Sequence, residues 1–329
     1  MVFANVREML MRTRLLMFSR HYFRNWIWAG LKYYLFKRGL IKSGVLSIWC
    51  RDGAMFAINP KLYKRLVKNL FEVRELFEGF FIDLRCRDGA VIVKNFSIPI
   101  EELSLSCCVA DAIKLGWIYD SSRGCWVKNG ASFRHMRWVI IEVFDFGEYR
   151  HLDVKNKVVV DVGVAYGDST VYFLLRGAEH VVAIEPCPDV FNELLENLRL
   201  NNIMDKVSPI NKAVASVHDR INIECPSGNF VVDTISLRDI AKNINLDDAV
   251  LKMDCEGCEY DIILNEYEYV RQFNELYFEY HAYITKKPVE MLLKKLSKDF
   301  ECRIVSDEDF YKRHGFNRKL LGLVKCVKK

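Results

Sequence analysis

Three acidic residues stand where apolar runs of the sequence end. Asp161, Glu185 and Asp254 each close a run rich in valine, isoleucine and leucine. Such runs are typical of strands that are buried on both faces of a parallel sheet. Open α/β sheets bind ligands at the carboxyl ends of their strands. We therefore expect the three carboxylates to converge on one negatively charged crevice.

A glycine turn follows the first of these acids. Gly163 and Gly167 lie four residues apart, and Asp168 with the next two hydroxyl residues favours the start of a helix. A strand, a glycine turn and a helix are how a doubly wound sheet builds a nucleoside site. Glu185, 24 residues after Asp161, would accept hydrogen bonds from the ribose hydroxyls.

The type of nucleoside follows from the charges at this turn. A dinucleotide site would carry G-x-G-x-x-G, whereas this turn is G-x-x-x-G and carries Asp161 and Asp168, which would repel phosphates. S-adenosylmethionine (SAM) has an ammonium and a sulfonium that carboxylates attract, and its own carboxylate can bind helix N-terminal amides. We expect SAM as the cofactor. An NAD-linked oxidoreductase and a turn without any ligand remain the alternatives.

A second group of acids follows Asp254. Glu256 and Glu259 come within five residues of it, and His281 ends a later apolar run. Any of these three could act as the general base toward an acceptor hydroxyl, although His281 could equally be a structural histidine. The acids could instead hold a divalent metal, but we expect no metal. Cys255 and Cys258 lack a second pair at zinc spacing and are interpreted as incidental.

The elements that position these residues follow from the hydrophobic pattern. It predicts a basic amphipathic helical arm over 1–43, a hairpin-rich α+β region over 44–150 and a SAM-binding domain over 151–329. In the last domain strands and helices alternate, as in an α/β Rossmann-like fold. The expected helices are 60–76, 189–200, one beginning at 233, 260–273 and 288–297; further strands are expected at 207–214, 221–225, 276–280, 301–305 and 321–327.

The middle region carries repeated turn signals. The string Cys-Arg-Asp-Gly-Ala occurs at 50–54 and again at 86–90, each time between apolar runs. Asn129-Gly130 is a third signal of this kind. Asp-Gly and Asn-Gly between apolar runs are strong hairpin signals, so we expect three hairpins.

The arm is distinguished by its charge. Residues 1–42 hold nine Lys or Arg and one acid, a balance of +8, which leaves −3 for the rest of a chain whose total is +5. One helical face would carry an apolar stripe formed by Leu15, Phe18, Tyr22, Trp26, Ala29, Tyr33 and Phe36. We expect this stripe to pack on the chain itself or on a partner subunit; a membrane-surface contact is the competing interpretation. Nucleic acid is not an expected partner, because no recognition module accompanies the basic residues.

Cysteine usage bears on the compartment. The 329 residues include eleven cysteines in no framework spacing, without a secretory signal. This favours a reducing interior, hence a cytoplasmic protein that could be peripheral at the inner membrane face.

Residues 135–285 resemble the FkbM-type SAM-dependent methyltransferases. The resemblance rests on Asp-Val-Gly-Val-Ala-Tyr-Gly-Asp-Ser at 161–169, Ala-Ile-Glu-Pro at 183–186, Asn-Lys-Ala-Val at 211–214 and, above all, Leu-Lys-Met-Asp-Cys-Glu-Gly-Cys-Glu at 251–259. Val164 departs from the usual alanine.

The resemblance implies a class I methyltransferase sheet of seven strands with the last one antiparallel. Asp161, Gly163 and Gly167 would line the methionine part of SAM, Glu185 would hold the ribose, and Asp254 would face the methionine or the acceptor. Asp168 and Asn211 are assigned to the cofactor site as well. The implied activity is O-methylation of a hydroxyl on a sugar or a natural product, and we expect a saccharide or glycan as the acceptor. The basic arm alone suggests that this glycan is lipid-linked. A non-catalytic peripheral membrane protein that keeps the pocket is a third hypothesis, and an oligomer stays open.

Overall fold

The computed structural model describes residues 13–41, 44–76, 83–85, 89–93, 96–242, 244–246 and 248–329. The chain forms two compact units, Met1–Ile141 and Glu142–Lys329. The residues predicted as an arm and those of the hairpin-rich region thus share the first unit. The division lies between Ile141 and Glu142, inside α6 (Trp138–Phe144).

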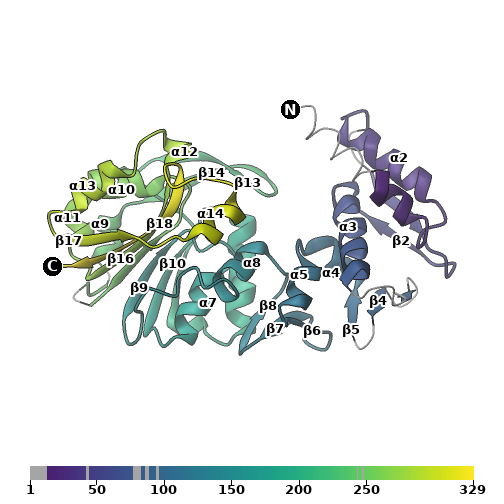
Figure 1. The fold of residues 1–329 in the computed structure, drawn as a ribbon, viewed down its shortest axis with the longest axis horizontal. Coiled ribbons are helices and arrows are strands. Elements are labelled where there is room, and N and C mark those ends of the chain that lie inside the picture. The colour runs from purple at the N-terminus through teal and green to yellow at the C-terminus, as the bar shows by residue number, and fades with distance from the viewer. Residues whose placement is uncertain are drawn as a thin grey trace. The chain divides into compact units, whose positions relative to one another are not determined.

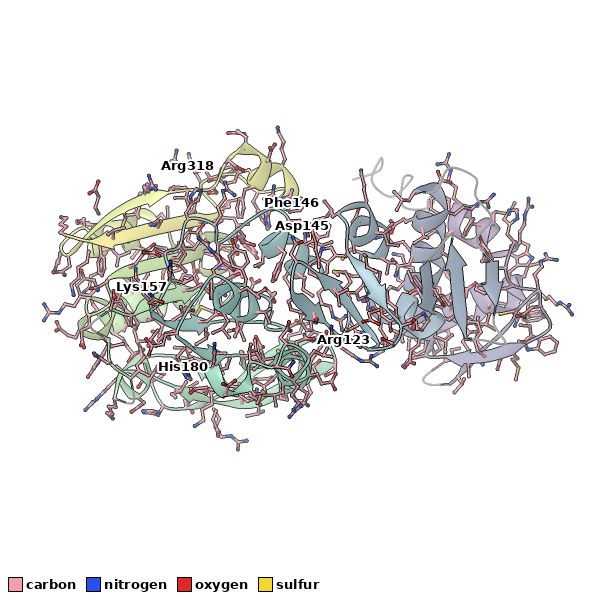
Figure 2. The ribbon with its side chains drawn as sticks, turned by 90° about the horizontal axis from the view of Figure 1, so that it is seen from below. Arg123, Asp145, Phe146, Lys157, His180 and Arg318 are labelled. Atoms are coloured by element: carbon pink, nitrogen blue, oxygen red, sulfur yellow. A yellow bond between two sulfur atoms is a disulfide. The ribbon has the colours of Figure 1, made fainter. Side chains whose placement is uncertain are left out.

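The second unit is built on a seven-stranded sheet. In spatial order the strands are β11 (Val207–Ile210), β10 (His180–Ile184), β9 (Val158–Val162), β15 (Val250–Met253), β16 (Glu275–His281), β18 (Leu321–Lys328) and β17 (Phe300–Ile304). The first five are parallel, and β18 is antiparallel to both of its neighbours. The predicted α/β Rossmann-like sheet with an antiparallel last strand is confirmed. Lys157 and His180, labelled in Figure 2, stand at the amino ends of β9 and β10, opposite the edge where the predicted site residues lie.

Helices cover both faces of this sheet (Figure 1). Alternate residues of a strand point to opposite faces, so Val159 and Val160 enter different apolar cores. One core includes α7 (Asp168–Leu175), α8 (Pro188–Leu200) and α14 (Glu308–His314). The other includes α9 (Leu237–Ala241), α10 (Cys258–Asn265), α11 (Tyr267–Val270) and α13 (Glu290–Leu296). The short α12 (Ala282–Thr285) follows β16, and a 3₁₀ turn, Met204–Lys206, precedes β11.

A small three-stranded sheet follows β11. It consists of β12 (Ala213–Val214), β14 (Gly228–Ile235) and β13 (Arg220–Cys225). The predicted strand at 207–214 is therefore two strands in different sheets. The predicted start of a helix at 233 is wrong, because four β-branched residues, Val231, Val232, Thr234 and Ile235, extend β14 through this position. The helix begins at Leu237, with the Ser236 hydroxyl accepting from the Asp239 amide at 3.1 Å.

The first unit packs short elements around one long helix, α3 (Pro60–Leu76). Two predicted hairpins, at Asp52-Gly53 and Asn129-Gly130, are confirmed as β1–β2 and β7–β8. The third joins β3 to β4, although residues 86–88 of its turn lie outside the described residues. The remaining elements are α2 (Trp26–Lys37), β1 (Leu46–Trp49), β2 (Met55–Ile58), β3 (Asp83–Arg85), β4 (Ala90–Val93), β5 (Phe96–Pro99), α4 (Ile100–Leu105), α5 (Val109–Lys114), β6 (Ile118–Asp120), β7 (Cys125–Lys128) and β8 (Ala131–Phe133).

The apolar stripe predicted a single helix for the arm, and this prediction is wrong. Residues 13–19 and α2 are helical, but the backbone between them pairs with the first hairpin. The Arg24 amide donates to the Trp49 carbonyl at 2.7 Å, and the Arg51 amide donates to the Tyr22 carbonyl at 3.0 Å. These hydrogen bonds replace those of a continuous helix. Residues 1–12 of the predicted arm lie outside the described residues. None of the helices in the described part of the chain combines the length and apolarity that spanning a bilayer requires.

The stripe nevertheless packs inside the first unit. Leu15, Phe18, Tyr22 and Ala29 are buried, and Phe18 contacts the ring of Phe71 edge-on at 5.2 Å between centroids. Intramolecular packing of this face, the expectation we favoured over a membrane contact, is therefore observed for these four residues.

A reducing interior, as expected from the sequence, would leave the cysteines as free thiols, but six of them are paired. Disulfides join Cys187 to Cys225, Cys255 to Cys258 and Cys302 to Cys326. The expectation of unpaired cysteines is wrong for these six. Spacing could not reveal the last pair, because it depends on the register that places Cys302 opposite Cys326 on β17 and β18. The cytoplasmic location stays a prediction.

Candidate functional site

The turn after β9 lies against the end of β15. Gly163 has φ +75°, and a Cβ at this position would stand 1.8 Å from the Asp254 carbonyl oxygen. The Asp254 amide in turn donates to the Val162 carbonyl at 3.0 Å. Only glycine fits such an approach of two backbones. The predicted glycine and the predicted third acid are thus brought together.

The turn ends at the start of α7. Gly167 has φ +85° and is the N-cap residue, so Asp168 is the first residue of the helix. Asp168 is 4% exposed and its Oδ1 has no hydrogen-bond partner among the described residues. Burial raises the pKa of Asp168 to about 7. An acceptor atom without a partner at this point can take a hydrogen bond from a ligand.

Asp161 lies beneath the turn and has no exposed surface. Its Oδ2 accepts from the hydroxyls of Ser169 at 2.7 Å and Thr170 at 3.1 Å. Its Oδ1 is 3.1 Å from Nζ of Lys252, a buried lysine of β15. These contacts fix the start of α7 to the two central strands.

Lys252 was quoted in the sequence motif but was given no role there. Its Nζ also donates to the Gly163 carbonyl at 2.6 Å and stands 5.1 Å from the ring centre of Tyr149. Burial lowers its pKa, but the carboxylates of Asp161, Asp254 and Asp168 outweigh this and raise it. The side chain is therefore a fixed positive charge under the turn. A lone lysine inside an apolar strand was the available signal.

Glu185 follows β10 beside the same turn. Its Oε2 accepts from the Ala165 amide at 3.1 Å and its Oε1 from the Cys187 amide at 2.9 Å. Burial raises the pKa of Glu185 to about 7, although these two amides oppose the rise. Asn211 supports this corner, because its Nδ2 donates to the carbonyls of Glu185 at 2.8 Å and Pro186 at 3.1 Å. The carboxylate is held by one amide at each oxygen and retains lone pairs for hydroxyl donors.

Asp254 connects this group to the acids that follow. The Tyr149 hydroxyl donates to its Oδ2 at 3.0 Å, and its Oδ1 is 3.7 Å from Nε2 of His281. Burial raises its pKa, but the charges of Lys252 and His281 prevail and lower it. Asp254 is therefore ionised at neutral pH.

His281, at the end of β16, is 1% exposed and surrounded by acids. Its Nδ1 is 3.2 Å from Oε1 of Glu259, and its Nε2 is 3.3 Å from Oε2 of Glu279 and 3.7 Å from Oε2 of Glu256. Burial lowers the pKa of His281, but the hydrogen bonds to Glu259 and Glu279 and the charge of Asp254 raise it to about 11. The imidazole of His281 is therefore protonated at neutral pH when only these carboxylates surround it.

The three predicted base candidates differ in access. Glu259 is fully buried and accepts from the backbone amides of Gly257 at 2.9 Å and His281 at 2.8 Å. The Glu256 side chain is 70% exposed and accepts from the Tyr283 hydroxyl at 3.2 Å. Only Glu256 among the three is open to an acceptor from solvent.

Two further side chains join the cluster without having been predicted. Glu279 is 7% exposed, and burial together with the Asp254 charge raises its pKa to about 8. Tyr149 precedes β9 by several residues and orients Asp254. Glu279 and His281 are alternate residues of one strand and so share a face, which is the sequence signal for Glu279. Tyr149 had no such signal.

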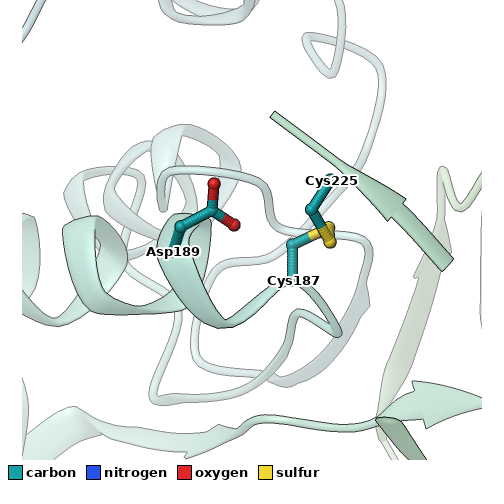
Figure 3. A group of neighbouring side chains, drawn as sticks. All are labelled: Cys187, Asp189 and Cys225. Atoms are coloured by element: carbon teal, nitrogen blue, oxygen red, sulfur yellow. A yellow bond between two sulfur atoms is a disulfide. The ribbon is translucent and has the colours of Figure 1, made fainter. Parts of the chain in front are cut away.

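Another group of potential metal ligands lies beside α8. Asp189 stands next to Cys187 and Cys225, as Figure 3 shows. The two sulfurs are bonded to each other, and a disulfide lacks the thiolate that binds metals. This group therefore offers a single carboxylate.

Comparison with known families agrees with the predicted resemblance. Residues 161–302 match the family model described as methyltransferase FkbM domain.

Two curated proteins are similar over shorter stretches. An uncharacterized protein 158B of Sulfolobus islandicus rod-shaped virus 1 is 26% identical over 130 residues, which are 40% of this chain and 65% of that protein. The ribosomal protein L11 methyltransferase of Geobacter sp. (strain M21) is 36% identical over 63 residues, 19% of this chain and 21% of that protein. The matched stretches thus span less than two thirds of either relative.

Solved structures show low similarity. The methyltransferase FkbM of Methylobacillus flagellatus KT aligns with a TM-score of 0.40 and 14% identity over 80% of this chain and 60% of that one. A putative rRNA methylase from Clostridium thermocellum aligns with a TM-score of 0.40 and 12% identity over 56% and 93% of the two chains.

The buried ion pair predicts a stability effect. Lys252→Met removes the cation that pairs with buried Asp161, whose carboxyl group keeps only its hydroxyl partners, so we expect the second unit to lose about 3–5 kcal/mol of unfolding free energy. All six tryptophans lie in residues 1–141, so tryptophan fluorescence would not report on unfolding of the second unit. We would therefore follow urea unfolding by far-UV circular dichroism and use calorimetry to separate the two units. The matched control is Lys242→Met, which removes the exposed pair with Asp239 and should cost less than about 1 kcal/mol. Equal effects of the two variants would refute the buried charge pair.

Proposed function

Because residues 161–302 match the methyltransferase FkbM domain model, we propose that the chain is a SAM-dependent methyltransferase acting on a hydroxyl acceptor. The observation that carries the proposal is the corner formed by Glu185 and the turn after β9. There a buried carboxylate is oriented by two backbone amides beside a glycine turn.

The polar groups of this corner suit a cationic nucleoside. Glu185 would accept from the ribose hydroxyls through its remaining lone pairs. The Oδ1 of Asp168 would accept from the ammonium of the methionine part. Asp161 would act indirectly, because it is fully buried and holds Lys252 and the start of α7. Asn211 would act indirectly as well, by holding the backbone that carries Glu185.

The acceptor side would be formed by Asp254, Glu256 and the groups around His281. Bound SAM supplies an activated methyl group: the acceptor oxygen attacks its carbon, the carbon–sulfur bond breaks, and the electron pair goes to sulfur. The hydroxyl proton needs a base, and Glu256 offers an exposed carboxylate 3.7 Å from Nε2 of His281. Glu259 would position His281 and not touch the acceptor, because it is fully buried.

We propose a saccharide or glycan hydroxyl as the acceptor, as the family resemblance implies. Two other hypotheses stay testable. An NAD-linked oxidoreductase would require a pyrophosphate beside Asp168 and Glu185, whose negative charges oppose it. A non-catalytic protein would bind SAM without transferring its methyl group.

Cofactor binding provides the first test. Glu185→Ala should weaken SAM binding by about 2–4 kcal/mol, because one or two charge-assisted hydrogen bonds are lost. Since the pKa of Glu185 is raised to about 7, wild-type affinity should fall as the pH decreases from 8 to 6 and the carboxylate gains a proton. Isothermal titration with SAM and with NAD measures both effects. Unchanged affinity in the variant, or binding of NAD in place of SAM, would contradict the assignment.

Transfer provides the second test. We expect incubation with methyl-labelled SAM and a fractionated extract of source cells to label a carbohydrate-containing fraction. Glu256→Gln should reduce the rate by about 10²–10⁴-fold if it is the general base, with SAM affinity unchanged. Glu308→Gln, on α14, is the matched control. SAM binding without label in any fraction would favour the non-catalytic hypothesis.

We also propose that the first unit contacts an anionic membrane surface through α2. The stripe predicted for this contact is in part buried, but another face of α2 presents Ile27, Trp28 and Leu31, which are 58%, 72% and 43% exposed. These residues lie at i, i+1 and i+4, and the same segment carries exposed Arg20, Arg24, Lys32, Lys37 and Arg38. Exposed apolar groups among cations suit an interface with anionic lipid.

Vesicle binding tests this contact. The full chain should cosediment with phosphatidylglycerol-containing vesicles and not with pure phosphatidylcholine vesicles, because the cations require negative lipid. Trp28→Ser should weaken the binding at least threefold through loss of buried apolar area. Val231→Ser, which alters an exposed valine of β14, should have no effect. Absence of binding to either vesicle would eliminate the membrane contact.

A further inference from the structure

The imidazole of His281 is oriented from one side. Glu259 is fully buried and accepts from Nδ1 at 3.2 Å and from the amide of the same histidine at 2.8 Å. A second amide, that of Gly257, fixes the carboxylate at 2.9 Å. A carboxylate that binds one imidazole nitrogen selects the tautomer and directs the other nitrogen, an arrangement characteristic of metal-binding histidines.

The other nitrogen points at three carboxylates. Nε2 is 3.3 Å from Glu279 Oε2, 3.7 Å from Asp254 Oδ1 and 3.7 Å from Glu256 Oε2. These distances exceed the about 2.7–2.9 Å of a charge-assisted hydrogen bond. Two ligand atoms at about 2.1 Å from a shared ion are roughly 3.0–3.5 Å apart. The separations therefore approach those of ligands around one cation.

Glu279 supplies an independent sign of an absent ligand. Its side chain is 9% exposed, and its Oε1 has no hydrogen-bond partner among the described residues. An unpaired oxygen of a buried carboxyl group is costly unless something binds it. The other oxygen of Asp254 is already occupied by the Tyr149 hydroxyl at 3.0 Å, which leaves Oδ1 facing Nε2.

We propose that Asp254, Glu279 and His281 bind a divalent cation, which displaces the proton from Nε2 of His281, with Glu256 at its open side. Ligand atoms from the three residues lie within 4.8 Å of one another. One imidazole and two carboxylates form a mixed nitrogen and oxygen donor set, which suits Mn²⁺ or Zn²⁺ better than an all-oxygen site would. Since the sequence predicted no metal, this site departs from that expectation.

The charge at this edge favours such an ion. Four carboxylates, those of Asp254, Glu256, Glu259 and Glu279, face a single imidazole. A cation of charge +2 between them would offset the repulsion among these acids. The exposed side, where Glu256 stands, leaves coordination positions for water or for an oxygen of the acceptor.

The role of the ion, though not its binding, rests on the proposed function. A cation beside the acceptor hydroxyl would lower the pKa of that hydroxyl, and its proton would pass to Glu256 before the oxygen attacks the methyl carbon. The site would then restrict acceptors to those that present an oxygen to the cation, such as a saccharide hydroxyl or a neighbouring pair of hydroxyls.

Direct metal binding is the test. The full chain, first treated with a chelator and then dialysed, is titrated with Mn²⁺, and free Mn²⁺ is followed by electron paramagnetic resonance, with Zn²⁺ as a competitor. We expect one saturable site per chain, lost in Glu279→Gln and in His281→Ala. Glu259→Gln should weaken binding by about 10–100-fold, as removal of a residue that orients a metal ligand does. Asp189→Asn is the matched control and should bind Mn²⁺ as the wild type does.

The same preparations are titrated with SAM, which separates the two proposals and shows that each variant is folded. SAM binding by a wild-type chain that lacks a saturable Mn²⁺ site overturns the metal site and leaves the proposed function standing. Mn²⁺ binding that persists in Glu279→Gln and His281→Ala also overturns it. A wild-type chain that binds Mn²⁺ but not SAM supports the metal site and contradicts the proposed function.

Discussion

The ion pair between Lys252 and Asp161 organises the centre of the second unit. Both side chains are removed from water, which costs several kcal/mol for each ion, in round numbers, unless other polar groups compensate. Here the ammonium also binds the Gly163 carbonyl, and the carboxylate binds two hydroxyls of α7. The pair therefore joins the two central strands, the glycine turn and the helix after it. The positions of Asp168 and Asp254 depend on this arrangement.

The same constraint explains the order of the site. Asp254 follows the strand that carries Lys252, and its amide binds β9, so its carboxylate is set at the carboxyl edge. Tyr149 contacts Oδ2 of this carboxylate and His281 lies near Oδ1, so the two side chains fix its orientation. A positive charge under the turn and several negative charges at the edge produce a field that favours cationic ligands.

Much of this was predictable from the sequence. The apolar runs ending in Asp161, Glu185 and Asp254 identified neighbouring central strands, because a buried strand and its terminal acid are local features. The antiparallel last strand came from the resemblance. Other features depend on distant contacts: the break after residue 19 requires the hairpin at Trp49, and the disulfide of Cys302 requires the register of two strands. Glu279 and Tyr149 joined the site for the same reason, since their partners are far away in the chain.

The disulfide between Cys187 and Cys225 has a mechanical consequence. It attaches the β13–β14 hairpin to a residue two positions after Glu185, with the two Cα atoms 5.7 Å apart. The hairpin therefore cannot swing away from the start of α8 while the bond is intact. The disulfide thus limits the motion of the hairpin beside Glu185. On the side of Glu256, the side chain of Tyr283 is joined to that carboxylate by a hydrogen bond and not by a covalent bond.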